Sequence, residues 1–320
     1  MKKISILLTV VVTSVLIMAF LGCGGGKSND MEAVDNLLRE AEDLIQSGES
    51  EEAIEKCDLA LEIDPENADV YCDRGYAYHD LGQCEKAMDD FNKAIELDPE
   101  LATVYYNRGQ TLIDTDDYEA ALGDCTKAIE LDPYLSVAYN NRGLCYLLLG
   151  QYDESIADSD KALELDPLAA VTHVNRGRAY GKLQEWERAL EDYNQAIDID
   201  PSRQDGYFYR GNAYFHLGVL DKAVEDFSKA IELYPEDSSA YHNSAAAYGE
   251  MGELEKCLED CTKTIELDPE DTLVYYTRGI AYKGLGREEE AIADFQKALE
   301  IDPMLEGPKQ NLREMGVPGY

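Results

Sequence analysis

Residues 93–99 read KAIELDP, and residues 127–133 repeat this heptapeptide without change. Close copies of it end at three later prolines, and the same proline recurs along most of the chain. Eight of the ten prolines are spaced 34 residues apart: Pro65, Pro99, Pro133, Pro167, Pro201, Pro235, Pro269 and Pro303. A fixed period of this size is typical of repeat architectures, in which each unit packs mainly on its neighbours. The heptapeptide therefore predicts an array of repeats and is a structural corner rather than a functional motif.

Placing this proline at position 32 divides residues 34–305 into eight repeats of 34 residues, which share columns of small and aromatic residues. Position eight is most often Gly: Gly75, Gly109, Gly143, Gly177, Gly211 and Gly279. Position twenty is most often Ala: Ala53, Ala87, Ala121, Ala189, Ala223 and Ala291. Apolar residues recur at spacings of three and four, which predicts helices at about positions 1–14 and 17–30. Gly at position fifteen and Pro at position 32 are expected to end them.

These columns resemble the tetratricopeptide repeat (TPR) family over residues 34–305. The resemblance implies an all-α fold, a right-handed superhelical solenoid of stacked TPR helix pairs whose first helices line a concave groove. The Gly and Ala columns suggest that the two helices of a repeat meet where both carry small residues. Residues 306–320 are expected to form a short capping helix, because the last repeat of a solenoid otherwise exposes an apolar face.

The N-terminus has a different composition. Lys2 and Lys3 precede an uncharged apolar run up to residue 22, which predicts a signal peptide over residues 1–22. The sequence FLGC at 20–23 resembles a bacterial lipobox, which implies that Cys23 carries the lipid and that residues 23–33 form a flexible tether. An uncleaved membrane anchor is the alternative, since the run is near spanning length. Both interpretations place the repeats in a bacterial cell envelope, on the extracytoplasmic face of a membrane.

The net charge of −38 limits the classes of partner. Nucleic acid is not expected, because phosphate binding needs clustered Lys and Arg. Much of the acidity lies on the second helices and corners, which indicates either a solvated convex face or a polyanionic surface for divalent or basic partners. An acidic surface repels anionic lipid headgroups, so membrane attachment is assigned to an N-terminal lipid.

The sequence contains no constellation that predicts catalysis. No nucleophile–base pair, phosphate-binding Gly loop or carboxylate pair stands out, so we expect no enzyme activity and no catalytic residues. Cys257 and Cys261 lie four residues apart, which is half of a metal site at most, and no second pair accompanies them. We therefore expect no metal and no cofactor. Most cysteines stand at core positions and are expected to be small buried side chains.

The resemblance implies that the groove is lined by positions 2, 5, 6, 9, 12 and 13 of each first helix. Position six is Asn in four repeats, and an Asn amide can both donate to and accept from a peptide backbone. The alternative is that these are ordinary solvated helix residues. The candidate groove residues are Tyr106, Asn107, Asn140, Asn141, Asn175, Arg178, Phe208, Tyr209, Asn212, Asn243 and Tyr276. Position five carries no Lys, so the carboxylate clamp known in some TPR proteins is not expected here.

The sequence thus predicts a membrane-anchored, outward-facing TPR scaffold, monomeric, that binds proteins or extended peptides. A receptor for small apolar or cell-wall-derived ligands is the alternative, and it should show a closed aromatic pocket around Phe208, Tyr209 and Phe215.

Two packing predictions follow from the columns. Arg at position seven and Asp at position 23 recur together and should form a ladder of ion pairs on facing helices. Repeat seven should be overpacked and weakened by four larger or altered residues: Ser244, Ala245, Cys257 and Thr264.

Overall fold

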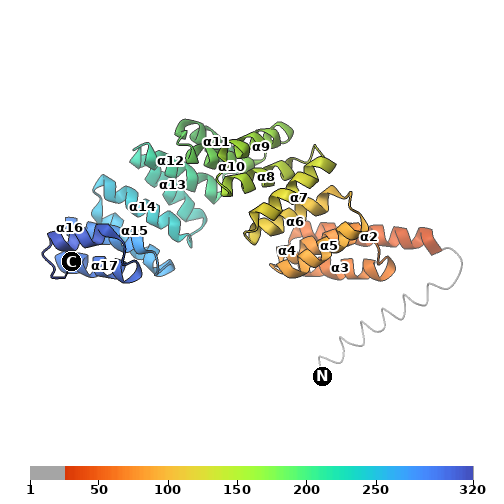
Figure 1. Cartoon of the computed structure of the whole chain (residues 1–320), viewed down its shortest axis with the longest axis horizontal. Helices are drawn as coiled ribbons and strands as arrows, with labels where there is room; N and C mark the ends of the chain where they lie inside the picture. Colours follow the sequence, from red (N-terminus) through yellow and green to blue (C-terminus); the bar gives the residue numbers. More distant parts are fainter. Residues whose placement is uncertain (1–25, 320) are drawn as a thin grey trace, which may run out of the picture. The chain divides into compact units, whose positions relative to one another are not determined.

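The computed structural model describes residues 26–319, and these residues form helices joined by short corners (Figure 1). The helices are α2 (Gly26–Ser47), α3 (Ser50–Ile63), α4 (Ala68–Asp80), α5 (Cys84–Leu97), α6 (Ala102–Asp114), α7 (Tyr118–Leu131), α8 (Ser136–Leu148), α9 (Tyr152–Leu165), α10 (Ala170–Lys182), α11 (Trp186–Ile199), α12 (Gln204–His216), α13 (Leu220–Leu233), α14 (Ser238–Met251), α15 (Leu254–Leu267), α16 (Thr272–Gly284), α17 (Glu288–Ile301) and α18 (Glu306–Glu314). Two helices fill each repeat at the expected positions. The predicted all-α fold of stacked helix pairs is therefore confirmed.

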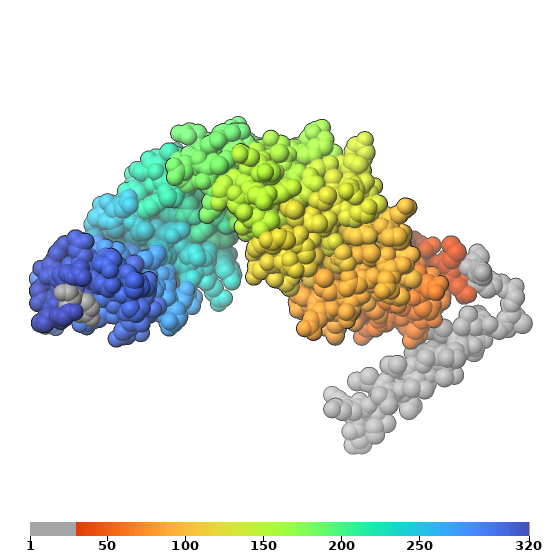
Figure 2. Space-filling model, in the orientation of Figure 1, coloured from red at the N-terminus to blue at the C-terminus, as the bar shows by residue number. Residues whose placement is uncertain are grey.

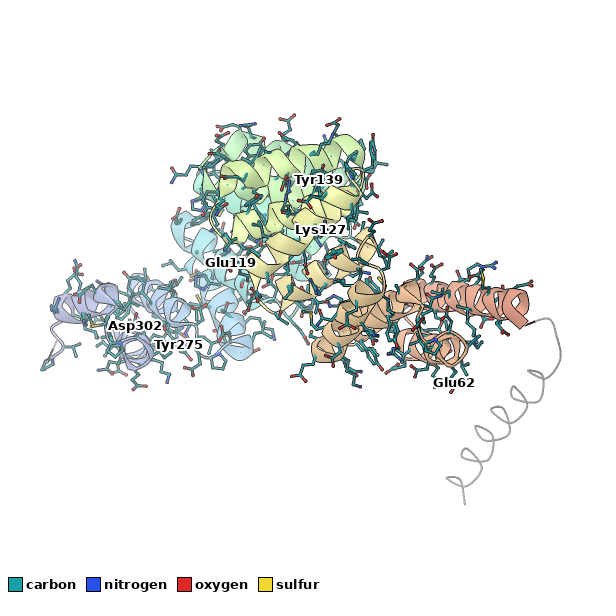
Figure 3. All side chains as sticks on the ribbon, turned by 45° about the vertical axis from the view of Figure 1, so that its right-hand side comes forward. Glu62, Glu119, Lys127, Tyr139, Tyr275 and Asp302 are labelled. Carbon is teal, nitrogen blue, oxygen red and sulfur yellow. The ribbon has the colours of Figure 1, made fainter. Side chains whose placement is uncertain are left out.

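The chain forms two compact units, one ending at Cys145 and one beginning at Tyr146, so that the boundary lies within α8. In the first unit each helix from α2 to α7 packs on its chain neighbours, and α4 also contacts α2 and α6. In the second unit α9 to α18 pack in the same order, and the first helices α10, α12, α14 and α16 contact one another in sequence. Within each unit, consecutive repeats adjoin in the order of the chain (Figure 2).

The repeated heptapeptide forms the corner after each second helix. Asp98 ends α5 in an extended conformation, its N–H donating to the carbonyl of Ala94. Its carboxylate accepts from the N–H of Glu100 at 2.9 Å, the local bond that makes Asp a good turn residue. The other corner needs a left-handed backbone at position fifteen. Gly82 has a φ of 68° there, and Asp116 adopts 62° at the same position without being Gly.

In several repeats the Gly at position eight makes room for an aromatic ring. A Cβ on Gly75 would lie 2.6 Å from Cε1 of Phe91, and one on Gly211 would lie 2.8 Å from Cε1 of Phe227. These rings stand at position 24 of the repeat, on the second helix, and are fully buried. The expected meeting of small residues occurs beside the ring, since a Cβ on Gly211 would also lie 3.3 Å from the carbonyl oxygen of Ala223. In these repeats Gly is needed because the partner side chain is large.

The predicted ion-pair ladder is confirmed in five repeats. In each, Nε and a terminal nitrogen of the Arg donate to the two carboxylate oxygens of the Asp sixteen residues later. The pairs are Arg74–Asp90, Arg108–Asp124, Arg176–Asp192, Arg210–Asp226 and Arg278–Asp294, with distances of 2.6–2.9 Å. In four of them the free guanidinium nitrogen also reaches the preceding second helix, as in Arg74 Nη1 to Asp58 at 2.6 Å. Bidentate pairing of this kind fixes geometry as well as charge.

The two ends of the array carry separate predictions. The signal peptide at 1–22 and the lipidated Cys23 lie outside the described residues. Residues 23–33 are expected to form a flexible tether, but from Gly26 onward they belong to helix α2. Met31, Glu32 and Ala33 are good helix formers, and the buried face of α2 starts at Val34, which is 3% exposed. At the other end α18 packs on α17 and buries Leu312.

Among the described residues, no helix combines the length and the apolar character required to cross a bilayer.

Candidate functional site

A cavity of about 420 Å³ lies in the second unit, between the first helices of repeats five, six and seven. Helices α10, α12 and α14 provide most of its wall, and α11 closes one end. The lining residues are Arg178, Gly181, Lys182, Trp186, Tyr193, Tyr209, Asn212, Phe215, His216, Asn243 and Ala246. A volume of this size suits one or two side chains or a small ligand.

Repeat five opens this cavity through residues that its neighbours lack. Position twelve is Gly181 in repeat five, where repeats three and six carry Ile113 and Phe215. A Cβ on Gly181 would lie 3.3 Å from Cζ3 of Trp186, the only tryptophan of the chain. The Trp186 ring stacks on His216, with centroids 4.5 Å apart and planes 12° apart. Gly181 and Trp186 together therefore create an aromatic-walled space.

The charged groups of the cavity are all basic. Arg178 and Lys182 stand one turn apart on α10, and no Asp or Glu is among the lining residues. The Arg178 guanidinium lies 5.0 Å from the centroid of Tyr209, and its Nη1 donates to Oδ1 of Asn175 at 3.2 Å. Burial raises the pKa of the Tyr193 hydroxyl, so this side chain stays neutral and can act as a hydrogen-bond donor.

Four of the residues predicted from the sequence line this cavity: Arg178, Tyr209, Asn212 and Asn243. The last two are joined, since Nδ2 of Asn243 donates to Oδ1 of Asn212 at 2.8 Å. Phe208, also predicted, packs edge-on against Tyr209 with centroids 5.2 Å apart. The structure thus brings these predicted residues of the second unit to one place.

The other predicted residues lie elsewhere. In the first unit, Nδ2 of Asn141 donates to Gln110 at 2.8 Å and its Oδ1 accepts from Asn140, which leaves Asn141 4% exposed. Asn107 donates to Sγ of Cys72 at 3.4 Å. In the second unit Asn175 is 3% exposed.

The remaining two predicted residues are aromatic. Tyr106 packs at the edge of a core cluster in the first unit. Tyr276 packs against Phe295, with centroids 6.0 Å apart. Asn107, Asn141 and Asn243 thus make contacts between consecutive repeats, whereas the contact of Tyr276 with Phe295 lies within repeat eight.

Sequence reasoning missed Gly181, Trp186, Tyr193 and His216 as parts of one site. A signal for Trp186 exists in the columns, because no other repeat has Trp at position seventeen, whereas Gly181 shares position twelve with Gly249 of repeat seven. The columns gave no such signal for Tyr193, because position 24 varies and is Phe in three other repeats, Cys in three and Ser in one.

One set of contacts in the first unit resembles a catalytic triad, but its hydroxyl group is buried. Oγ1 of Thr111 lies 3.0 Å from Nδ1 of His79, whose Nε2 lies 3.3 Å from Asp114. Thr111 is 0% exposed, so no substrate reaches this hydroxyl, and the contact links α4 to α6. Over residues 26–319, no group of three or more His, Cys, Asp or Glu side chains is placed to hold a metal ion.

Comparison with known families identifies the class of protein. Models described as TPR repeat or tetratricopeptide repeat match residues 41–82, 75–116, 102–135, 134–202, 174–238, 227–259 and 273–305. Together these matches cover residues 41–259 and 273–305, which is more than half of the chain. The chain belongs to the tetratricopeptide repeat family. No curated protein matches the sequence.

Solved structures share the fold at low identity. A chain of the APC/C hetero-tetramer Cut9–Hcn1 is 19% identical with a TM-score of 0.68, and the match covers 87% of this chain and 55% of that chain. A TPR protein from Parabacteroides merdae is 19% identical with a TM-score of 0.59, covering 78% of this chain and 99% of that one. YrrB, a TPR protein with an unusual peptide-binding site, is 24% identical with a TM-score of 0.51, covering 59% and 97%. This chain therefore spans just over half the length of the Cut9–Hcn1 chain.

Proposed function

We propose that this protein is a membrane-anchored TPR scaffold of the bacterial cell envelope. It binds a protein or extended peptide partner at the cavity between α10, α12 and α14, and it has no catalytic role. Cys23 provides the lipid attachment, and the repeats face away from the cytoplasm as a monomer. The cavity is the observation on which the proposal rests, because it gathers four predicted groove residues beside an accessible aromatic wall.

Two further points support partner binding. TPR proteins are in general interaction scaffolds, and YrrB is described as having a peptide-binding site. The cavity also arises from departures from the repeat consensus at accessible positions, whereas repeat five keeps the small core residues Gly177, Ala189 and Ala196. Such departures add nothing to the packing of the helix pairs, which fits a role in recognition.

The experiment fills the cavity and leaves the fold in place. Gly181→Leu in the full-length chain should put a side chain against Trp186 and reduce photo-crosslinking of the partner from a crosslinker at position 182. Gly123→Leu is the matched control, since nothing lies within 4 Å of a Cβ on this exposed residue of α7. Both variants should keep their helix content by circular dichroism. Equal crosslinking of Gly181→Leu and wild type would place the partner elsewhere.

Membrane attachment has its own test. Cys23→Ala should abolish labelling with a fatty-acid analogue and leave a precursor that is not processed. Efficient labelling of this variant would rule out Cys23 as the attachment point.

The receptor for a small apolar or cell-wall-derived ligand remains a second candidate, because the aromatic wall of Trp186, Tyr209 and Phe215 could enclose such a molecule. A receptor should bind soluble cell-wall fragments with a change in Trp186 fluorescence and give no protein adduct from position 182.

A further inference from the structure

Repeat five reverses the charge of one surface position. Position thirteen is acidic in repeats two, three and seven, as Asp80, Asp114 and Glu250. In repeat five it is Lys182, and Arg178 lies one turn before it. The two cations therefore form a local basic site on a chain whose net charge is −38.

These two cations also lack the carboxylate partners that most others have. Lys229 and Lys263, for example, bind Glu232 and Glu266 three residues later, at 2.9 and 3.0 Å. Within residues 26–319 no ion pair joins Arg178 or Lys182 to an Asp or Glu, and the Arg178 head group has only the neutral Asn175 within hydrogen-bond distance. Both charges are thus available to a carboxylate from outside the chain.

The wall beside the cations is aromatic and partly accessible. Trp186, Tyr209 and Phe215 are half-buried, and His216 is exposed where it stacks on the indole. An entering aromatic ring can pack on these faces at offset or edge-on geometry and also meet the guanidinium over Tyr209. At about 420 Å³, the cavity has room for such a ring and a neighbouring side chain.

We propose that the cavity recognises an aromatic side chain and an adjacent carboxylate side chain within a peptide segment. The ring enters the space opened by Gly181, and the carboxylate binds Arg178 and Lys182. The remaining residues of the segment are neutral or basic, because further acids would be repelled by the surrounding surface. This inference rests on the proposed function and names the class of partner for the same cavity.

The test uses the fluorescence of Trp186, which reports on this cavity alone because the chain has no other tryptophan. The probe is a synthetic peptide, acetylated and amidated to remove terminal charges, with Glu-Phe flanked by Ser and Gly on both sides. Three further peptides replace Glu with Gln, replace Phe with Ala, or end in a free Phe carboxylate. The full-length chain should bind the Glu-Phe peptide about tenfold more tightly than the Gln-Phe and Glu-Ala peptides.

Variants of the protein test the carboxylate contact and the ring site separately. Arg178→Gln should remove most of the preference for Glu over Gln while leaving affinity for the Gln-Phe peptide within about twofold. Gly181→Leu should weaken both peptides, because it fills the ring site. Lys222→Gln is the charge-matched control: Lys222 is exposed, lies over Tyr214 and does not line the cavity. It should change neither affinity.

Each other outcome refutes one named part of the proposal. Equal binding of the Glu and Gln peptides refutes the carboxylate, and equal binding of the Phe and Ala peptides refutes the ring. Tighter binding of the peptide with a free C-terminal carboxylate replaces the internal segment with a chain end. Full affinity of the dipeptide acetyl-Glu-Phe-amide shows that a small molecule suffices. If the crosslinked partner still depends on Gly181 but no peptide is preferred, this inference fails and the proposed function stands.

Discussion

Repeat five and repeat seven both depart from the repeat consensus, but at different depths. Repeat five is unusual at Lys182 and Trp186, which line the cavity beside Gly181, and it keeps the small core residues Gly177, Ala189 and Ala196. Repeat seven is unusual at four core positions, each at most 1% exposed: Ser244, Ala245, Cys257 and Thr264. Departures at accessible positions thus create a site, whereas departures in the core need compensation within the repeat.

Repeat seven shows such compensation at three of the four positions. Ala245 shares a buried cluster with Cys261, which stands where other repeats carry a ring. Cys257 has room because a Cβ on Gly249 would lie 3.6 Å from its sulfur, an ordinary contact. The Thr264 hydroxyl donates to the carbonyl of Asp260 at 3.0 Å. At Ala245 and Cys257 the larger residue on one helix thus faces a smaller one on the other, so the expected overpacking is not seen at these two positions. The weakening of repeat seven stays a prediction.

The fourth departure is not compensated. Asp192 in repeat five binds Arg176 and His173, and these partners lower its pKa against the opposing effect of burial. Asp260 occupies the same position in repeat seven, where Ser244 replaces the Arg. Burial raises the pKa of Asp260, and the hydrogen bond from Ser244 offsets this only in part. The two repeats therefore differ chiefly in whether one buried carboxylate has a guanidinium partner.

The largest effect on stability should come from replacing the position-seven Arg of repeat five with Ser, the residue that repeat seven has there. Arg176→Ser removes the guanidinium from Asp192, which is 2% exposed, and from Asp160. We expect repeat five to lose about 2–4 kcal/mol of opening free energy at neutral pH, because the buried carboxylate of Asp192 then keeps only its contact with His173. Hydrogen exchange of the amides of α10 and α11 measures this loss.

The same substitution offers an internal check. The loss should shrink as pH falls below the unfolded pKa of about 3.9, because the folded-state pKa of Asp192 is lowered and its stabilising contribution is lost in that range. Arg188→Ser is the control, since Arg188 is 57% exposed in its pair with Glu185 and its loss should lower the opening free energy much less. Equal losses for the two variants would contradict a special role for the ladder.

A smaller effect on the stability of repeat five should follow from changing Gly177 and the Tyr193 ring that packs on it. Gly177→Ala places a Cβ 2.6 Å from Cε1 of Tyr193 and should destabilise repeat five by about 1–3 kcal/mol. The control Gly123→Ala, with open space around it, should stabilise α7 by about 1 kcal/mol or less. A double-mutant cycle with Tyr193→Cys, which copies the Ala–Cys pair of repeat seven, should show coupling of about 1 kcal/mol or more in chemical denaturation. Additive effects would mean that the pairing of volumes is not what matters.

Much of the fold could be predicted because the residues that make each interaction recur in several repeats. The spacing of the prolines gave the helix boundaries to within about one residue, and the recurrence of Arg and Asp gave the ladder. The size of the residue opposite Gly was missed, because position 24 varies between Phe91, Cys125 and Tyr193 and only the structure shows which helix faces it.

The candidate site was less accessible to prediction. The predicted first-helix positions include Arg178, Tyr209, Asn212 and Asn243, which line the cavity. Trp186 lies on a second helix, and it reaches the cavity only because Gly181 leaves space for its ring. A site made by the absence of a side chain has no positive motif, so a column-by-column comparison of repeats is the only sequence signal for it.

The smallest predicted effect concerns the unpaired carboxylate of repeat seven. The folded-state pKa of Asp260 is raised above its unfolded value, so the folded state binds this proton more tightly. The favourable contribution of the protonated group is complete below the unfolded pKa of about 3.9 and is lost as pH rises through the folded pKa. Asp260→Asn removes the charge and keeps an acceptor for Ser244. It should therefore raise the opening free energy of residues 238–271 at pH 8 by on the order of 1 kcal/mol or less, after allowing for solvent screening, and change little at pH 4.

The equivalent substitution in repeat five, Asp192→Asn, should have the opposite effect on stability. Comparing the two substitutions tests whether the guanidinium partner makes the difference. Asp192 has a lowered pKa, so its contribution is present above the unfolded pKa and lost as pH falls below it. Asp192→Asn should accordingly destabilise α10 and α11 at pH 8, where Asp260→Asn stabilises α14 and α15. Hydrogen exchange at both pH values, with opening free energies corrected for intrinsic exchange, compares the four helices in one experiment. If Asn at position 260 weakened repeat seven at pH 8, Ser244 would be a sufficient partner for the carboxylate, and the difference between the two repeats would have to lie in their packing.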